Sequence, residues 1–195
     1  LAPVHVATFA DDDFDIGEES ELAALAASYC LARRAKPLVF AGLQAIAGRQ
    51  PVSLSAFHDR AIARYVDDML KSGRIGTIYV FSGQMAQYIP ESFKGRVIVD
   101  FVDVDSAKFD AYAERDRGVI GWIEAREGRL LRLEEARIAA RADVSLLISK
   151  SEADLFRARL PERVQQLADV RVVGNGIDSR FFDPSLVGPE TRMLD

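Results

Sequence analysis

Short apolar runs alternate with longer amphipathic segments along the chain. The run at 96–102, R-V-I-V-D-F-V, is almost continuously apolar, as strands buried on both faces of a parallel sheet are. Segments with apolar residues at helical spacing predict amphipathic helices. The pattern predicts strands at 4–9, 37–40, 77–82, 96–102, 144–149 and 170–173. It predicts helices at 18–35, 58–73, 119–142 and 152–160, with a short helical piece at 85–89.

Strands and helices alternate in this order, which predicts the fold class. We expect an α/β fold with a Rossmann-like, doubly wound, mostly parallel sheet and helices on both faces. A chain of 195 residues can bury one full core, so we expect a single domain at 1–174. In the helix at 119–142 we expect Leu130, Leu133 and Ile138 on the buried face and the charged residues, Glu127 among them, on a solvated face.

Composition and charge limit the classes of function. With 49% apolar and 28% charged residues the chain falls in the ordinary range of globular domains. The net charge of −5 argues against a nucleic-acid partner, which would need a basic face to neutralise phosphates. No apolar run approaches the length of a transmembrane helix, and no export signal precedes Val4. The single cysteine, Cys30, cannot form an internal disulfide, so we expect a cytoplasmic protein.

Polar clusters follow four of the predicted strands, where functional residues of such folds gather. They lie at 11–13, 82–84, 103–108 and 149–152, and the third is the richest. Its two carboxylates, Asp103 and Asp105, have a spacing that can hold a divalent cation and a diphosphate. The same spacing is common in solvated turns that start a helix, with Asp105 or Ser106 as the N-cap. Both interpretations stay open.

The fourth polar cluster and the known sequence motifs indicate no particular chemistry. In the fourth cluster we expect Ser149 or Ser151 to cap a helix whose free N–H groups could also serve an anion. The sequence contains no H-x-x-x-H pair, no G-x-S-x-G elbow, no Walker loop and no G-x-G-x-x-G, so it predicts no metal site from those patterns.

The segment at 170–184, V-R-V-V-G-N-G-I-D-S-R-F-F-D-P, predicts a short buried strand that runs into a glycine-bracketed turn and an aromatic-proline stop. Gly176 permits a positive φ, and Asn175 can hydrogen-bond to its own backbone. We expect an interdomain hinge or linker remnant at 175–195, with Asn175, Gly176 and Asp178 at its turn.

Several of these segments together resemble one family. The most specific are D-F-V-D-V-D-S-A-K at 100–108 and V-G-N-G-I-D-S-R-F-F-D-P at 173–184. The others are V-A-T-F-A-D-D at 6–12, V-F-S-G-Q-M-A-Q-Y at 80–88, R-E-G-R-L-L at 126–131 and L-I-S-K-S-E-A-D-L-F at 147–156. In this order they resemble the GT-B glycosyltransferases of the large retaining family 4, in particular the sugar transferases associated with the exosortase/PEP-CTERM exopolysaccharide system.

The resemblance implies an acceptor-side domain at 1–174 whose partner would be a C-terminal donor-binding domain of the same protein. The enzyme would move a sugar from a nucleotide-sugar donor to a glycan or lipid-linked acceptor with retention, and it would require no cofactor and no metal. Asp103 and Asp105 fall on the loop where many relatives place a histidine that contacts the reacting sugar, so they are the catalytic candidates. The remaining candidates would bind substrate: Ser82, Ser106, Lys108 and Ser149.

Relatives begin with an additional strand and a loop containing glycine and lysine, and this chain starts at what would be their second strand. We therefore expect the chain alone to be inactive and the strand at 4–9 to have one unpaired edge, left open or filled by a second copy in a homodimer. A lipid-linked acceptor would place the cytoplasmic protein at the inner membrane face.

Two other classes of function stay open. A Mg²⁺- or Mn²⁺-dependent phosphate-handling enzyme would use Asp103 and Asp105 as its metal site. A non-catalytic binding module would have the same fold but no pocket that joins the Ser82, Asp103 and Ser149 loops.

Overall fold

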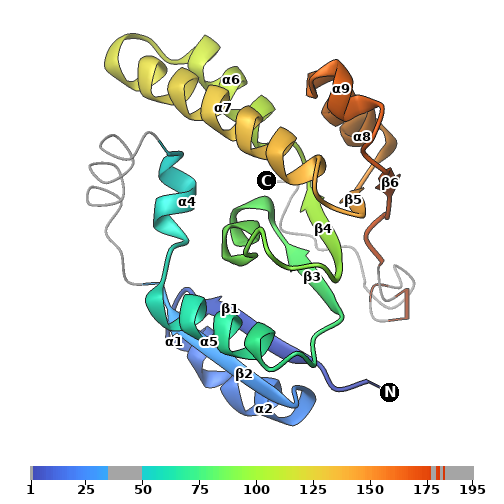
Figure 1. The fold of residues 1–195 in the computed structure, drawn as a ribbon. Helices are drawn as coiled ribbons and strands as arrows, with labels where there is room; N and C mark the ends of the chain where they lie inside the picture. The colour runs from blue at the N-terminus through green and yellow to red at the C-terminus, as the bar shows by residue number, and fades with distance from the viewer. Residues whose placement is uncertain (1, 35–49, 177–178, 181, 183–195) are drawn as a thin grey trace.

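The structure is a computed structural model that describes residues 2–34, 50–176, 179, 180 and 182 (Figure 1). The strand predicted at 37–40 lies outside the described residues, and so does most of the predicted linker. Among the described residues, no helix is both long and apolar enough to cross a membrane.

The described strands form two parallel sheets. The larger sheet has the order β3-β4-β5-β6, and the smaller one pairs β1 with β2. The strands of the larger sheet are β3 (Thr77–Phe81), β4 (Arg96–Val102), β5 (Val144–Leu147) and β6 (Val170–Val172). The smaller sheet contains β1 (His5–Ala10) and β2 (Ser28–Arg33). The predicted α/β class with parallel strands and flanking helices is therefore confirmed, although these strands are split between two sheets.

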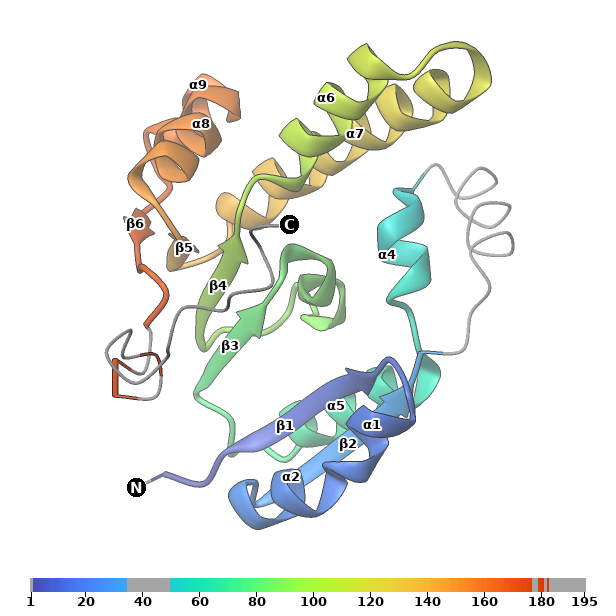
Figure 2. The ribbon, with the colours of Figure 1, turned by 180° about the vertical axis from the view of Figure 1, so that it is seen from behind.

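Helices flank both sheets. The first half of the chain contributes α1 (Asp13–Gly17), α2 (Glu19–Leu25), α4 (Val52–Ala56), α5 (Arg60–Lys71) and the 3₁₀ helix η1 (Gly83–Tyr88). The second half contributes α6 (Asp105–Arg115), α7 (Gly118–Ala139), α8 (Lys150–Arg159) and α9 (Glu162–Gln165). Figures 1 and 2 show α5 against the smaller sheet and α6 and α7 as an antiparallel hairpin that extends away from both sheets.

The main core lies between the larger sheet and the helices that follow it. Val80, Val99 and Leu147 are buried on one face of three neighbouring strands. Phe101 of β4 packs against Phe156 of α8, with ring centroids 4.7 Å apart. These strands overlap the ranges predicted at 77–82, 96–102, 144–149 and 170–173. The apolar pattern has its physical reason in the two central strands, β4 and β5, which are covered on both faces.

The helix predicted at 18–35 is wrong in its second half. α2 ends at Leu25, and the following segment is β2, which pairs in parallel with β1 from His5↔Ser28 to Ala10↔Arg33. The Ser28 hydroxyl also lies 2.7 Å from His5 Nδ1 and 2.7 Å from Tyr65 Oη. Tertiary pairing therefore overrides the helix propensity of an alanine- and leucine-rich segment.

The predicted faces of the long helix α7 are wrong in part. Ile138 is buried as predicted and Leu130 is half-buried, but Leu133 is exposed, whereas Glu127 and Glu135 are buried. The buried face of α7 meets the beginnings of α4 and α6, and the backbone N–H groups there need acceptors. Glu127 accepts hydrogen bonds from the N–H groups of Val52 and Ser53 at 2.7 and 2.9 Å. A carboxylate on α7 thus supplies the N-cap that α4 lacks locally.

Each sheet has an edge that faces no other strand in the described part of the chain. β1 pairs with β2, and β3 pairs with β4, but β1 and β3 do not pair with each other. Within the described residues β1 pairs only with β2, so one edge of the strand at 4–9 carries no other strand there. Gly76 and Ser82 flank β3, and the Gly76 carbonyl and the Ser82 N–H form hydrogen bonds with β4. Because backbone groups alternate in direction along a strand, those of Thr77, Tyr79 and Phe81 face the open edge of β3.

Candidate functional site

The candidate site lies where β3 and β4 end. These strands are parallel neighbours with Phe81 opposite Asp100, so the residues that follow them emerge at the same edge of the sheet. Ser82 follows β3, and Asp103 and Asp105 follow β4. The structure thus brings two of the polar clusters predicted from the sequence side by side.

The backbone at both strand ends is in the left-handed region without glycine. Ser82 has a φ of 71° and Val102 a φ of 67°. Such a conformation costs about 1–3 kcal/mol, and it is most unusual for a β-branched residue. Val102 is fixed by a hydrogen bond from its N–H to Asp100 Oδ1 (3.1 Å) and by one from the Ile148 N–H to its carbonyl oxygen (2.8 Å). Backbone strain of this kind concentrates at functional sites, so it supports a functional site at this edge of the sheet.

The polar side chains at this edge form one contact network, which we call the strand-end cluster: Ser82, Gln84, Asp103, Asp105 and Lys108. Gln84 Nε2 donates to Asp105 Oδ2 at 2.7 Å, and Ser82 Oγ donates to Gln84 Oε1. Lys108 Nζ lies 2.6 Å from Asp103 Oδ1 and 3.2 Å from Asp105 Oδ1. Four of the predicted site residues therefore belong to one network, in which Gln84 links Ser82 to Asp105 and Lys108 links Asp105 to Asp103.

The cluster retains a formal negative charge. Burial lowers the pKa of Lys108, but hydrogen bonds and charges from Asp103 and Asp105 outweigh it, so this pKa lies above its ordinary value. One ammonium group therefore faces two carboxylates. The side chains of Asp103 and Asp105 are 28% and 27% exposed, which leaves carboxylate oxygens accessible from solvent. Such a surface can accept hydrogen bonds from hydroxyl groups of a ligand.

A small pocket lies beneath the cluster. It is lined by the two strand-end loops, by α4 and by α7: Leu54, Gly83, Gln84, Phe101, Asp103, Asp105, Leu131, Glu134, Glu135 and Ile138. Its free volume of about 10 Å³ corresponds to about one water molecule. A sugar-sized ligand at the cluster would therefore lie on its open side and not inside the pocket.

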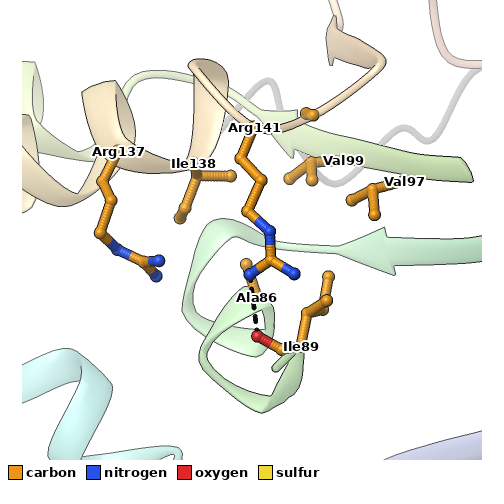
Figure 3. Close-up of a pocket in the computed structure, with 8 residues that line it drawn as sticks. Ala86, Ile89, Val97, Val99, Arg137, Ile138 and Arg141 are labelled. Atoms are coloured by element: carbon orange, nitrogen blue, oxygen red, sulfur yellow. Dashed lines mark hydrogen bonds between the residues drawn. The ribbon is translucent and has the colours of Figure 1, made fainter. Parts of the chain in front are cut away.

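A second small pocket lies away from this chemistry, between η1, β4 and the end of α7 (Figure 3). Its walls are mainly apolar, and Arg141 closes it by donating to the carbonyl oxygens of Ile89 (3.0 Å) and Pro90. Arg137 at its rim is paired with Glu134 at 2.6 Å. Arg141 thus fastens the segment after α7 to the end of η1, so the pocket is a packing feature.

Ser106 lies inside the protein and not on the cluster. It is fully buried, and its N–H and hydroxyl group donate to the two carboxylate oxygens of Glu135 at 2.9 and 2.6 Å. Arg159 Nε donates to the same hydroxyl oxygen at 3.1 Å. The predicted N-cap role of Asp105 or Ser106 is wrong, because α6 begins after Val104 and neither side chain caps it. The hydroxyl of Ser106 is engaged in fixing α6 and is not exposed to a substrate.

The network around Ser106 continues through Asp110. Arg132 and Arg159 both donate to Asp110 Oδ2 at 2.5 Å. Burial raises the pKa of Asp110, but the hydrogen bonds from both arginines outweigh it, so that pKa is lowered. Burial raises the pKa of Glu135, and its bonds to Ser106 offset this only in part. The network ties α6 to α7 and α8, which positions the loop that carries Asp103 and Asp105.

The sequence interpretation missed Glu127 and Glu135, although a signal was present. Both fall at core-face spacing with Leu131 and Ile138 in α7, and a charged residue at such a position indicates a buried polar contact. Arg159 gives no such local signal, because its partners Ser106 and Asp110 lie about 50 residues earlier.

Ser149 caps α8, as the sequence predicts. Its hydroxyl accepts from the Glu152 N–H at 3.1 Å and lies 2.8 Å from Ser151 Oγ. Glu152 Oε2 in turn accepts from the Val104 N–H at 2.9 Å. The Ser149 loop is thus tied to the Asp103 loop, but it does not line the pocket beneath the cluster.

The predicted hinge is described only in part. Asn175 and Gly176 are exposed at the end of the continuous stretch 50–176, and Asp178 lies outside the described residues. Gly176 permits a positive φ but does not adopt one in this structure.

The acidic cluster at 11–13 is structural. Asp12 caps α1 by accepting from the N–H groups of Phe14 and Asp15. Asp11 pairs with Arg34 at 3.0 Å and Asp13 with Arg33 at 2.9 Å. Within the described ranges, no three or more histidine, cysteine, aspartate or glutamate residues are grouped so that they could hold a metal ion.

The described fold and site define an α/β protein with an accessible acidic cluster at adjacent strand ends. No model of a known protein family matches the chain, and no curated protein matches it either.

Proposed function

We propose that this chain is the acceptor-side domain of a retaining glycosyltransferase that acts in exopolysaccharide synthesis. The complete enzyme moves a sugar from a nucleotide-sugar donor to a glycan or lipid-linked acceptor. The observation that carries the proposal is the strand-end cluster, in which Asp103 and Asp105 remain accessible beside two non-glycine residues in left-handed backbone.

The chemistry of the cluster suits a substrate rich in hydroxyl groups. Carboxylate oxygens accept hydrogen bonds from sugar hydroxyls, and such charge-assisted bonds are stronger than neutral ones. A fixed carboxylate near the reacting carbon also stabilises oxocarbenium-like positive charge as it develops. Asp103 and Asp105 fill these roles, and Lys108 holds both carboxylates in place.

The open side of the cluster supports a shared site. The pocket beneath it has room for about one water molecule, so the described residues alone do not enclose a donor and an acceptor. In the proposal a donor-binding domain of the same protein covers the cluster and excludes water when the cleft closes. The isolated chain is then inactive, and the donor nucleotide-sugar is the only small molecule that the reaction needs.

The proposal is tested with the complete protein that contains this chain. It is incubated with radiolabelled nucleotide-sugars and a membrane or glycan fraction as acceptor, with and without EDTA. Transfer of label that persists in EDTA supports the proposal. Hydrolysis of a phosphate ester without sugar transfer, or activity that EDTA abolishes, contradicts it.

The metal-dependent alternative rests on the same carboxylate pair. A divalent cation between Asp103 and Asp105 would have to displace the ammonium group of Lys108, which contacts both. We therefore predict that titration calorimetry with MgCl₂ or MnCl₂ gives no binding heat for the wild type at millimolar metal. Tight binding that disappears in Asp105→Ala would instead establish the phosphate-handling class.

The binding-module alternative predicts no pocket that joins all three of the Ser82, Asp103 and Ser149 loops. The loops of Ser82 and Asp103 share the small pocket, whereas the Ser149 loop contributes no residue to it. A turnover measurement separates the two cases, because a binding module retains ligands without converting them.

A further inference from the structure

An exposed apolar cluster lies at the connection between α6 and α7. We call it the hairpin tip, and it consists of Tyr112, Val119, Ile120, Trp122 and Ile123. Val119 is 74% exposed, Trp122 62% and Ile120 61%, and the other two are above 40%. Single exposed apolar residues are ordinary, but five large ones within twelve positions are a feature that indicates an interaction surface.

The spacing places these side chains on neighbouring sides of one helix end. Val119, Trp122 and Ile123 stand three and four positions apart, and Ile120 lies one turn before Ile123. Tyr112 belongs to the last turn of α6, where its ring lies against the Arg115 guanidinium. Both views show the connection between α6 and α7 at the end of the hairpin that is farthest from the sheets (Figures 1 and 2).

The hairpin is held by the side-chain bonds of Ser106 to Glu135 and of Arg132 to Asp110, and by a close backbone approach at its tip. Gly118 has a φ of +71°, which allows the chain to turn into α7. A Cβ at Gly121 would stand 2.2 Å from the Asp116 carbonyl oxygen, so the glycine permits the close approach of the two helices. These contacts do not involve the side chains of Val119, Ile120, Trp122 and Ile123, which are exposed to solvent.

Charged groups surround the apolar side chains. Arg117 and Arg129 are exposed, and neither forms an ion pair with a described residue. Arg115 is paired with Asp116 at 3.0 Å. Glu114 is the exposed acid of this turn, and Glu124 is half-buried beside Asp116. Among exposed groups without an ion pair, the rim of the tip thus carries more positive than negative charge.

We propose that the hairpin tip inserts into the interface of an anionic lipid bilayer. Tryptophan and tyrosine favour the headgroup region, isoleucine and valine bury apolar surface in it, and arginine attracts anionic lipids. A projecting tip enters a headgroup layer directly, whereas a flat protein partner would cover only part of it. The inference does not depend on the proposed reaction, because it rests on side chains outside the strand-end cluster.

The tip carries its own reporter, since Trp122 is the single tryptophan of the chain. Fluorescence of the chain is recorded during titration with vesicles of phosphatidylglycerol and phosphatidylethanolamine. Trp122 emission is expected to shift to shorter wavelength, and lipids brominated on the acyl chain are expected to quench it. The double variant Arg117→Ala/Arg129→Ala is expected to bind about thirtyfold more weakly, since each basic group contributes about 1 kcal/mol near an anionic surface.

Matched variants separate insertion from other causes. Ile120→Glu/Ile123→Glu is expected to abolish the spectral shift, whereas Leu133→Glu, which changes an equally exposed residue about three turns further along α7, is expected to leave it intact. Circular dichroism checks that each variant is folded. An unchanged spectrum in all vesicles overturns the proposal. Equal binding to neutral phosphatidylcholine overturns it too, and so does a concentration-dependent shift without vesicles, which would indicate a second copy.

Discussion

Replacing Glu135 with leucine is expected to lower the free energy of unfolding by about 1–3 kcal/mol. Glu135 is buried and accepts two hydrogen bonds from Ser106, and Arg159 bonds to the same hydroxyl. Leucine has a similar volume but no acceptor, so the Ser106 N–H would lose its partner inside the protein. Urea unfolding monitored by circular dichroism measures the change.

Two further variants control for this result. Glu114→Leu changes an exposed glutamate of α6 and is expected to alter stability by less than about 0.5 kcal/mol. Glu135→Gln preserves the shape but cannot ionise. Because burial raises the pKa of Glu135 above 4.5, the unfolded state releases this proton first as the pH rises. The wild type should therefore lose stability relative to Glu135→Gln in the window just above pH 4.5, and a gain there would contradict the account.

The second large effect concerns activity. Asp105→Ala in the complete protein is expected to lower the kcat of sugar transfer by roughly 10²–10³. The substitution removes a charged acceptor from the open side of the cluster, and it leaves Gln84 and Lys108 without one of their contacts. Initial-rate measurements with the labelled donor provide the comparison.

Asp67→Ala is the matched control for that experiment. Asp67 also forms a single ion pair, with Lys71 of α5, but it lies on an exposed helix surface outside the cluster. Its variant is expected to have wild-type rates. If Asp105→Ala and Asp67→Ala both leave kcat unchanged, the strand-end cluster does not take part in the reaction.

The sequence predicted the strands and helices whose apolar residues follow a regular local spacing. β4 and β5 could be predicted because central parallel strands are apolar on both faces, and α5 because its apolar residues repeat at helical spacing. β2 could not, because Ser28–Arg33 is a strand only through its pairing with β1. In that segment the helix propensity of the residues before it favoured the wrong state.

The candidate site also contains residues that the sequence could predict and residues that it could not. Asp103, Asp105 and Lys108 could be found because polar residues stand directly after a buried strand. The burial of Ser106 could not be predicted, since it results from Glu135 and Arg159, which reach it from two later helices. The left-handed backbone of Val102 also had no sequence signal, because valine does not favour that conformation.

The central claim is that the strand-end cluster serves retaining sugar transfer. The most direct test is proton NMR of the anomeric centre in the product that the complete protein first forms from a nucleotide-sugar. The account predicts a product with the anomeric configuration of the donor, and loss of that product in Asp103→Asn/Asp105→Asn. A product of inverted configuration, or a double variant as active as the wild type, would contradict it.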